Sequence, residues 1–388
     1  MKQIKENIVQ NQSLNRRRFL QVTASGAVAT SLLSTMQTSE AKAAKTYTWI
    51  SPRGTIEVLD DYPYWVAKEM GYFGDIDTRL EPGPSDGTAT VKFVALGQAD
   101  MGYPSPGVFS FAIENELNLI SVFNMGARDV FDFAFRPGEG FKDLKNMEGK
   151  TVLLGSAAWQ SIADPIFAAA GADVTKINYV EAGWPQWGTI LASGEGDAAL
   201  SWEGLRADWE GKGLKFEYWL GVDHSIFPAN SFVVQKSDMD SNEKREILGQ
   251  YLRGWAMGLE FGEHNPRAAT DIVFKALPIV KSNLGAELGT ESMMQLANVF
   301  RGNMEERQGW GYHDWGSWKA YFKTIRKIGQ LKRNVNVNKV LTNDFIAPAN
   351  DFDVSQVKAD AQKYSLSAEL SKVDIDKIKG RFYSNVVK

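Results

Sequence analysis

The sequence contains no cysteine, and this absence removes several chemistries at once. Without a thiol the chain forms no disulfide, no thiolate metal site, no iron–sulfur cluster and no cysteine nucleophile. Histidine is almost as scarce. His224, His264 and His313 lie far apart, and none has the spacing of a metal site. We therefore expect neither a metal nor another cofactor.

Two further features are missing. The net charge of −4 carries no positive excess, so a nucleic-acid partner is not expected. No apolar run reaches the roughly 20 residues that a membrane-spanning helix needs. The sequence also shows no internal repeat and no low-complexity tract. Its composition, 44% hydrophobic and 23% charged, is instead typical of a globular protein.

The first 43 residues have the composition of an export signal. Three arginines at 16–18 precede Phe19 and Leu20, a mild apolar stretch follows at 22–33, and Ala-Lys-Ala closes the segment at 41–43. A basic region, a short apolar region and a small-residue cleavage site are typical of secretory signals, and paired arginines indicate the twin-arginine route. The apolar stretch is too short for a membrane anchor. We expect cleavage near Ala43 and a soluble periplasmic protein.

Strand-like and helix-like segments alternate in two successive runs, 47–124 and 150–201, as in an α/β fold with mainly parallel sheets. The later chain is mostly helical, with amphipathic stretches at 242–263, 266–276, 290–302 and 315–331. The chain would leave the first lobe near 131–135 and return near 230–234. We expect two α/β lobes, a two-strand hinge and a ligand cleft between them. The expected divisions are 1–43 for the signal, 44–130 for the first part of lobe 1, 131–234 for lobe 2, 235–350 for the return of lobe 1, and 351–388 for a helical tail of open role.

Four segments, in this order and spacing, resemble a known family. They are KEMGYF at 68–73, LGQADMG at 96–102, LKNMEGKTV at 144–152 and GEGDAALSWE at 194–203. Over roughly residues 46–350 the chain is similar to periplasmic solute-binding proteins of ABC importers of the nitrate/sulfonate/taurine type, and to related binders of thiamine-pyrimidine precursors. The resemblance implies the type II periplasmic binding protein fold. It also implies capture of a small organic solute, delivery to an ABC permease with its ATPase subunit, and no catalysis.

Two nucleotide-like motifs are better explained as turns. Gly149-Lys150-Thr151 ends like a P-loop, but Leu144 stands where the first glycine belongs and the lysine enters a strand. The segment 194–199 fits G-x-G-x-x-A, but it follows a helix and precedes a strand, which is the reverse of a dinucleotide site.

The expected cleft lies where strands end and helices begin, because ligands of α/β sheets bind at that edge. Helix N-termini there suit an anionic or acceptor-rich ligand, and serine hydroxyls and arginines add polar contacts. Any one serine could equally cap a helix, and any one aromatic residue could belong to the core. The predicted ligand-binding residues are Arg53, Thr55, Tyr64, Ser85, Asp86, Gly87, Tyr103, Ser105, Arg128, Asp129, Trp159, Gln160, Ser161, Trp184, Trp202 and Glu203.

The charge of the ligand stays open at this stage. Tryptophan walls with carboxylates suit a cationic amine, whereas helix N-termini suit a sulfonate or a carboxylate. A zwitterion such as an aminosulfonate would satisfy both. The loops carry eight acids that could reach the cleft: Glu57, Asp60, Asp61, Asp86, Asp129, Asp164, Glu181 and Glu203.

Two other functions remain. The chain could sense a ligand or act as a scaffold for a membrane receptor in place of a permease. It could also resemble enzymes that make the thiamine pyrimidine, although those use a cysteine-rich motif with histidine and iron, and this chain has no cysteine. We expect a monomer whose partners are a small molecule, the permease and ATPase, and the twin-arginine export machinery.

Overall fold

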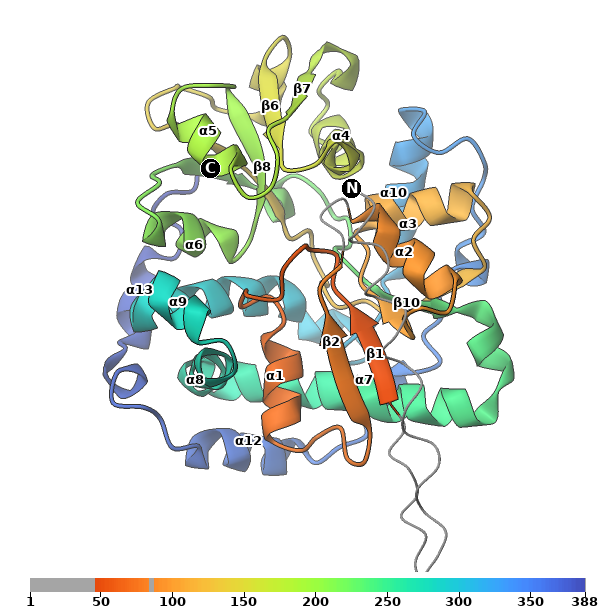
Figure 1. Cartoon of the computed structure of the whole chain (residues 1–388). Helices are drawn as coiled ribbons and strands as arrows, with labels where there is room; N and C mark the ends of the chain where they lie inside the picture. Colours follow the sequence, from red (N-terminus) through yellow and green to blue (C-terminus); the bar gives the residue numbers. More distant parts are fainter. Residues whose placement is uncertain (1–45, 84–86, 388) are drawn as a thin grey trace, which may run out of the picture. The chain divides into compact units, whose positions relative to one another are not determined.

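Two five-stranded sheets form the centre of the molecule (Figure 1). This computed structural model describes residues 46–83 and 87–387, so the expected export signal lies outside the described residues. The first sheet has the order β2-β1-β3-β10-β4 and the second has the order β7-β6-β8-β5-β9. The expected pair of α/β lobes is confirmed.

In the first sheet, β1, β2 and β3 each lead into a helix. β1, β2 and β3 are parallel, and β10 pairs antiparallel with β3 and β4. Ser105 caps α3, since its Oγ accepts a hydrogen bond from the Val108 N–H at 3.2 Å. The elements are β1 (Thr46–Ile50), α1 (Tyr62–Glu69), β2 (Asp77–Glu81), α2 (Thr88–Ala95), β3 (Met101–Gly102), α3 (Pro106–Glu114), β4 (Leu119–Phe123) and β10 (Phe232–Gln235).

The second sheet repeats this plan. β6, β7 and β8 are parallel, and β5 runs antiparallel between β8 and β9. Its elements are β5 (Phe131–Phe135), β6 (Thr151–Leu154), α4 (Gln160–Ala169), β7 (Asn178–Glu181), α5 (Trp187–Ala192), β8 (Ala198–Trp202), α6 (Leu205–Gly211) and β9 (Glu217–Leu220).

One expected boundary differs in the structure. The sequence division places residues up to 234 in the second lobe, but β10 pairs with β3 and β4 of the first sheet. An apolar strand pattern does not show which sheet the strand will join, because its partners are distant in sequence. The chain therefore passes between the lobes at 124–130 and again at 221–231.

The helices after β10 pack mainly on the first lobe, and α9 also packs against α6 of the second. α7 lies on α1, where the rings of Trp255 and Tyr64 are 5.9 Å apart. Gly285 has a positive φ, so α9 bends there. Within the described residues, no helix is long and apolar enough to cross a membrane. The helices are α7 (Asn242–His264), α8 (Pro266–Ala276), α9 (Pro278–Arg301), α10 (Trp315–Lys327), α11 (Ile346–Ala349), α12 (Val354–Lys363) and α13 (Ile375–Arg381).

Residues 354–387 form a C-terminal strap that touches both lobes. α12 packs on α7, and Arg381 forms ion pairs with Glu287 and Glu291 of α9. The strap then reaches the edge strand β9, where the Tyr218 N–H donates to the Asn385 carbonyl at 2.9 Å. The Val387 N–H donates in turn to the Tyr218 carbonyl at 2.9 Å. The strap therefore covers an edge of the second sheet that would otherwise be open.

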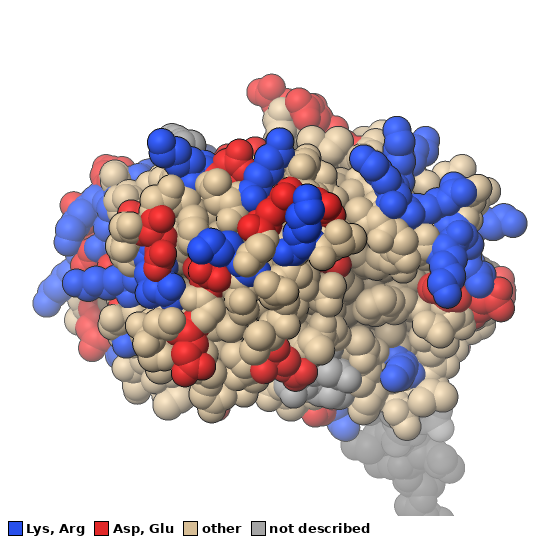
Figure 2. Space-filling model, turned by 90° about the horizontal axis from the view of Figure 1, so that it is seen from above, with Lys and Arg blue, Asp and Glu red and all other residues tan. Residues whose placement is uncertain are grey.

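Charged side chains of both signs are interspersed over much of the face shown in Figure 2, and lysines and arginines gather at one end of it. The most basic segment of the chain is 315–340, which holds seven lysines and arginines and no acid. It includes α10. The overall acidic balance therefore coexists with a local basic region.

Candidate ligand-binding site

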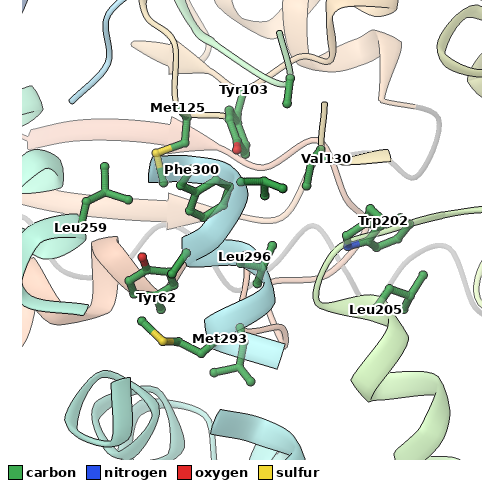
Figure 3. Packing of buried hydrophobic residues seen from close by; sticks show 14 of the residues in the cluster. Tyr62, Tyr103, Met125, Val130, Trp202, Leu205, Leu259, Met293, Leu296 and Phe300 are labelled. Carbon is green, nitrogen blue, oxygen red and sulfur yellow. The ribbon is translucent and has the colours of Figure 1, made fainter. Parts of the chain in front are cut away.

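A small apolar cavity, here called the inner cavity, lies between the two lobes and has a volume of about 70 Å³. Figure 3 shows part of its surroundings: Leu296 and Phe300 on one helix, with Trp202 beside Leu205 across from them. The walls come from both sheets and from α9. The lining residues are Pro52, Arg53, Asp60, Gly87, Tyr103, Ser105, Val108, Val130, Phe131, Trp159, Ile162, Leu200, Trp202, Asn230, Leu296 and Phe300.

The topology explains why polar and aromatic groups meet here. Arg53 follows the carboxyl end of β1, Tyr103 follows β3, and Trp202 ends β8. Because these strands are parallel within their sheets, their carboxyl ends lie at one edge of each sheet. The two edges face each other across the cavity, so each lobe supplies part of the wall.

A buried ion pair occupies one side of the inner cavity. Arg53 Nη2 lies 2.6 Å and 2.5 Å from the two carboxylate oxygens of Asp61, which is fully buried. Arg53 Nη1 lies 3.5 Å from Asp60 Oδ1. One guanidinium therefore serves two carboxylates, so this cluster carries a net charge of −1 when both acids are ionised.

Arg53 lies closer to Asp61 than to Asp60, so Asp60 is the charged group of this cluster that can still bind a ligand. The Trp202 indole also donates a hydrogen bond to it. Burial raises the pKa of Asp60 to about 6, and the Arg53 charge opposes part of that rise. At neutral pH the carboxylate is therefore mostly ionised.

Two buried polar atoms of the lining have no hydrogen-bond partner in the described part of the protein. They are Arg53 Nε, a donor, and Asn230 Oδ1, an acceptor. The Asn230 amide is oriented by its own Nδ2, which donates to the Tyr103 carbonyl at 3.2 Å. Unpartnered buried groups are costly, so a ligand that supplied both partners would gain affinity here.

Six of the predicted ligand-binding residues line the inner cavity: Arg53, Gly87, Tyr103, Ser105, Trp159 and Trp202. Thr55 and Trp184 lie in an adjoining hollow that shares Trp202 and Asp60 with it. Ser85 and Asp86 lie outside the described residues.

Other predicted residues are engaged elsewhere. Tyr64 is buried in the core against α7, and its hydroxyl lies 3.2 Å from the Thr78 carbonyl oxygen. Glu203 is buried and paired with Arg206, with Arg206 Nη2 2.8 Å from its Oε2. Both residues lie in segments that approach the cleft, but their side chains point into the protein interior. The position of a residue in the sequence indicates that it lies at a strand end, but it does not indicate where its side chain points.

Three further predicted residues, Arg128, Gln160 and Ser161, lie beside the cleft without lining the cavity. Arg128 donates from Nη2 to the Val222 carbonyl at 3.0 Å, and Gln160 is exposed. The backbone oxygen of Ser161 contacts the first lobe: it accepts from Gln330 Nε2 at 3.0 Å. A Cβ on Gly107 would lie 2.6 Å from that same oxygen, so only glycine permits this approach of the lobes. These contacts describe closed lobes.

Most of the apolar lining was not predicted from the sequence. Leu296 and Phe300 come from α9, which is far along the chain from the other walls, and their i, i+4 spacing places them on one helix face. No local pattern separates them from ordinary core residues. Asp60 was one of eight acids that could reach the cleft, and only the fold distinguishes it from the others.

Asp129, also predicted as a ligand residue, instead ties the two crossings between the lobes. Its Oδ2 accepts from the Ser225 hydroxyl at 2.8 Å, and its Oδ1 accepts from the Phe131 N–H at 3.1 Å. Burial raises the pKa of this carboxyl to about 7. The hinge therefore holds an acid that titrates near neutral pH.

This gives a stability prediction. A carboxyl with a raised pKa binds its proton more tightly in the folded protein than in the unfolded chain, where aspartate titrates near 4. Stability therefore falls as pH rises from about 4 to about 7. From pH 7.5 to pH 5.5 we expect Asp129 to add about 2 kcal/mol to the free energy of unfolding. Urea denaturation at both pH values measures the change.

Asp129→Asn is the matched test of that prediction, because it keeps the shape and removes the proton equilibrium. The variant should lose most of the pH-dependent gain, while Asp60→Asn should lose a smaller part of it. An Asp129→Asn protein with the same pH dependence as the parent would contradict the assignment.

Comparisons with known proteins agree with this geometry. The model of the family described as NMT1/THI5 like matches residues 60–269, more than half of the chain. The formylaminopyrimidine-binding protein of Halalkalibacterium halodurans is 24% identical over 299 residues, which cover 72% of this chain and 87% of that protein.

Solved structures show the fold. The alkanesulfonate-binding protein SsuA of Xanthomonas axonopodis is 11% identical with a TM-score of 0.58, covering 78% of this chain and all of that one. The nitrate-binding protein NrtA of Synechocystis is 12% identical with a TM-score of 0.55, covering 86% and 99%. The desulfurization enzyme DszB, 13% identical with a TM-score of 0.51 over 79% and 98%, shares the fold as well. The periplasmic binding protein fold and the suspected resemblance are confirmed.

Proposed function

The chain belongs to the NMT1/THI5-like family, and from that premise we propose that it is the solute-binding component of an ABC importer. It captures a small organic solute between its lobes and delivers it to the permease and its ATPase. The observation that carries this proposal is the inner cavity, which is lined from both lobes and closed by their contact. After twin-arginine export the protein acts in the periplasm as a monomer.

The lining indicates the chemistry of the solute. It offers flat aromatic walls in Trp159, Trp202 and Tyr103. It also offers a carboxylate and an unpartnered amide oxygen, which need donors, and Arg53 Nε, which needs an acceptor. A single ring that carries an amino group next to a ring nitrogen supplies donors and an acceptor in one plane. We propose a small planar nitrogen heterocycle, neutral or cationic.

A nitrogen heterocycle fits the lining better than the anionic ligands that the sequence also allowed. A sulfonate or nitrate has acceptors only, so it would leave Asn230 Oδ1 unsatisfied and would face the Asp60 charge. In the cluster of Arg53, Asp60 and Asp61, the single positive charge is already paired with two carboxylates, so none is available to an anionic ligand. The similarity to a formylaminopyrimidine-binding protein supports a nitrogen heterocycle as the ligand.

Delivery follows from lobe closure. The contacts of Ser161 with Gln330 and Gly107 form only when the lobes approach. A ligand that fills the cavity stabilises this closed arrangement, because it contacts both lobes. The permease would then distinguish the loaded protein by its closed surface.

A ligand panel tests the proposal. Amino-substituted pyrimidines should raise the melting temperature and change the tryptophan fluorescence, and at 100 times the dissociation constant the stabilisation should be about 2.7 kcal/mol. Alkanesulfonates and nitrate serve as anionic probes and taurine as a zwitterionic one, and none of them should give a shift. A response to the anions alone would overturn the ligand class. No response to any small solute would instead favour the sensor or scaffold function.

We further propose that the protein binds its solute without transforming it. Within the described residues, the lining of the inner cavity holds no histidine, lysine or cysteine, and its one serine, Ser105, caps α3 and has no base beside it. The shared fold of a desulfurization enzyme does not transfer its chemistry. Stoichiometric iron in the purified protein, or turnover of a bound heterocycle, would contradict this part.

A further inference from the structure

A second cavity adjoins the first and is larger, with a volume of about 300 Å³. We call it the outer cavity. Asp60 and Trp202 line both cavities, so these two side chains lie where the cavities adjoin. The outer cavity is bounded by the loop 55–60, the loop before α5, the segment from β8 into α6, and α9. It therefore also lies between the lobes.

Aromatic rings make the wall contributed by the second lobe. Trp184 stacks on Trp202 with ring centroids 5.8 Å apart and planes 10° apart. It also stacks on Trp187 at 4.9 Å and 29°. Val280 and Leu284 of α9 also line this cavity and are buried. Such a wall accepts an apolar chain and presents ring faces that attract a cation.

The charges of the outer cavity are unbalanced toward the negative. Asp208 and Lys212 form an ion pair at 2.5 Å and cancel. Glu57 is exposed and has no ion-pair partner in the part of the chain that the structure describes. Asp60 shares the Arg53 cation with Asp61. A negative group placed here would be repelled, and a positive group would meet two carboxylates.

We propose that the outer cavity is a second subsite, which takes a tail bearing a positively charged amine attached to the ring held in the inner cavity. This inference rests on the proposed function. Because the inner cavity is small, we place any substituent of the ring in the outer cavity, which meets it at Asp60 and Trp202. The tail then lies along the Trp184 wall, and its ammonium group reaches Glu57.

The test compares three ligands by calorimetry: an aminopyrimidine, the same ring with an aminoalkyl tail, and the same ring with a hydroxyalkyl tail of equal length. We expect the amine tail to tighten binding about tenfold over the bare ring, and the hydroxyl tail to add little. Glu57→Gln should remove the gain of the amine tail and leave the affinity of the bare ring unchanged. Glu195→Gln, on an exposed turn of the second lobe, is the matched control and should keep the gain.

A tail-only probe, a phenylalkylamine, separates this inference from the proposed function. Its weak binding should quench tryptophan fluorescence in the parent protein and not in Trp184→Ala. If the rings fail to bind but the amine does so through Glu57, the ligand proposal falls and the outer subsite stands. If the rings bind and the amine tail gives no gain, or gives a gain that persists in Glu57→Gln, the outer subsite is overturned. If neither binds, both are overturned.

Discussion

Replacing Arg206 with methionine is expected to lower the free energy of unfolding by about 3–5 kcal/mol, because it leaves a buried carboxylate without its cation. Arg206 and Glu203 are each only 1% exposed in their side chains, and Arg206 Nε and Nη2 both bind Glu203 Oε2. Arg206 Nη1 also donates to the Phe382 carbonyl at 3.1 Å, so the same substitution loosens the C-terminal strap. Urea denaturation followed by circular dichroism measures the loss.

Two further variants show whether the lost charge is the cause. Adding Glu203→Leu to Arg206→Met removes the stranded carboxylate and should recover most of the stability. Lys176→Met breaks exposed ion pairs with Glu148 and Asp173 and should leave the unfolding midpoint unchanged. A double variant that is as unstable as the single one would indicate lost packing as the cause.

Replacing Asp60 with asparagine is expected to weaken binding of an amino-heterocycle about 10–100-fold, since a hydrogen bond to a charged group is worth about 1.5–3 kcal/mol. The substitution keeps the size and an acceptor oxygen but removes the charge. In the parent protein, affinity should fall as pH drops below about 6, because protonation of Asp60 has the same effect as the substitution. The variant should show no such fall.

Calorimetric titrations from pH 5 to pH 8 measure this behaviour. Asp351→Asn, at an exposed position just before α12, is the control and should bind like the parent at every pH. If Asp60→Asn binds the heterocycle as tightly as the parent, Asp60 does not contact the ligand. If the variant instead gains affinity for sulfonates, the site is anion-binding and the carboxylate was its obstacle.

The two lobes could be predicted from the sequence, but the directions in which the side chains point could not. Alternating strand and helix patterns predict two α/β units, because each strand and its following helix are local in the chain. The placement of β10 in the first sheet was not predictable, since its partners β3 and β4 lie more than 100 residues earlier. α6 and β9 were not expected at all. Short elements carry too few residues for a clear period.

The same distinction holds at the site. Trp202 and Tyr103 could be predicted from their positions at strand ends, which the topology brings to one edge. Tyr64 and Glu203 occupy similar positions, yet they point into the core and to Arg206. Leu296 and Phe300 reach the cavity only through the packing of α9 between the lobes. Tertiary contacts determine which of these side chains reach the cavity, and no residue spacing in the sequence indicates those contacts.

The C-terminal strap gives the molecule a third link between the lobes, and this link is non-covalent at its far end. It is fastened to α9 by Arg381 and to β9 by the backbone of Tyr218, and β9 leads directly into the crossing at 221–231. Two crossings alone would permit both bending and twisting. Because the strap is anchored at β9, next to the crossing at 221–231, it limits how far the lobes can open. The lobes can part freely only on the side away from β9. A wider rotation must first detach residues 385–387 from β9. The amplitude of opening is therefore limited by a tether, and a fluorescent label beside Tyr383 would report how far the lobes swing.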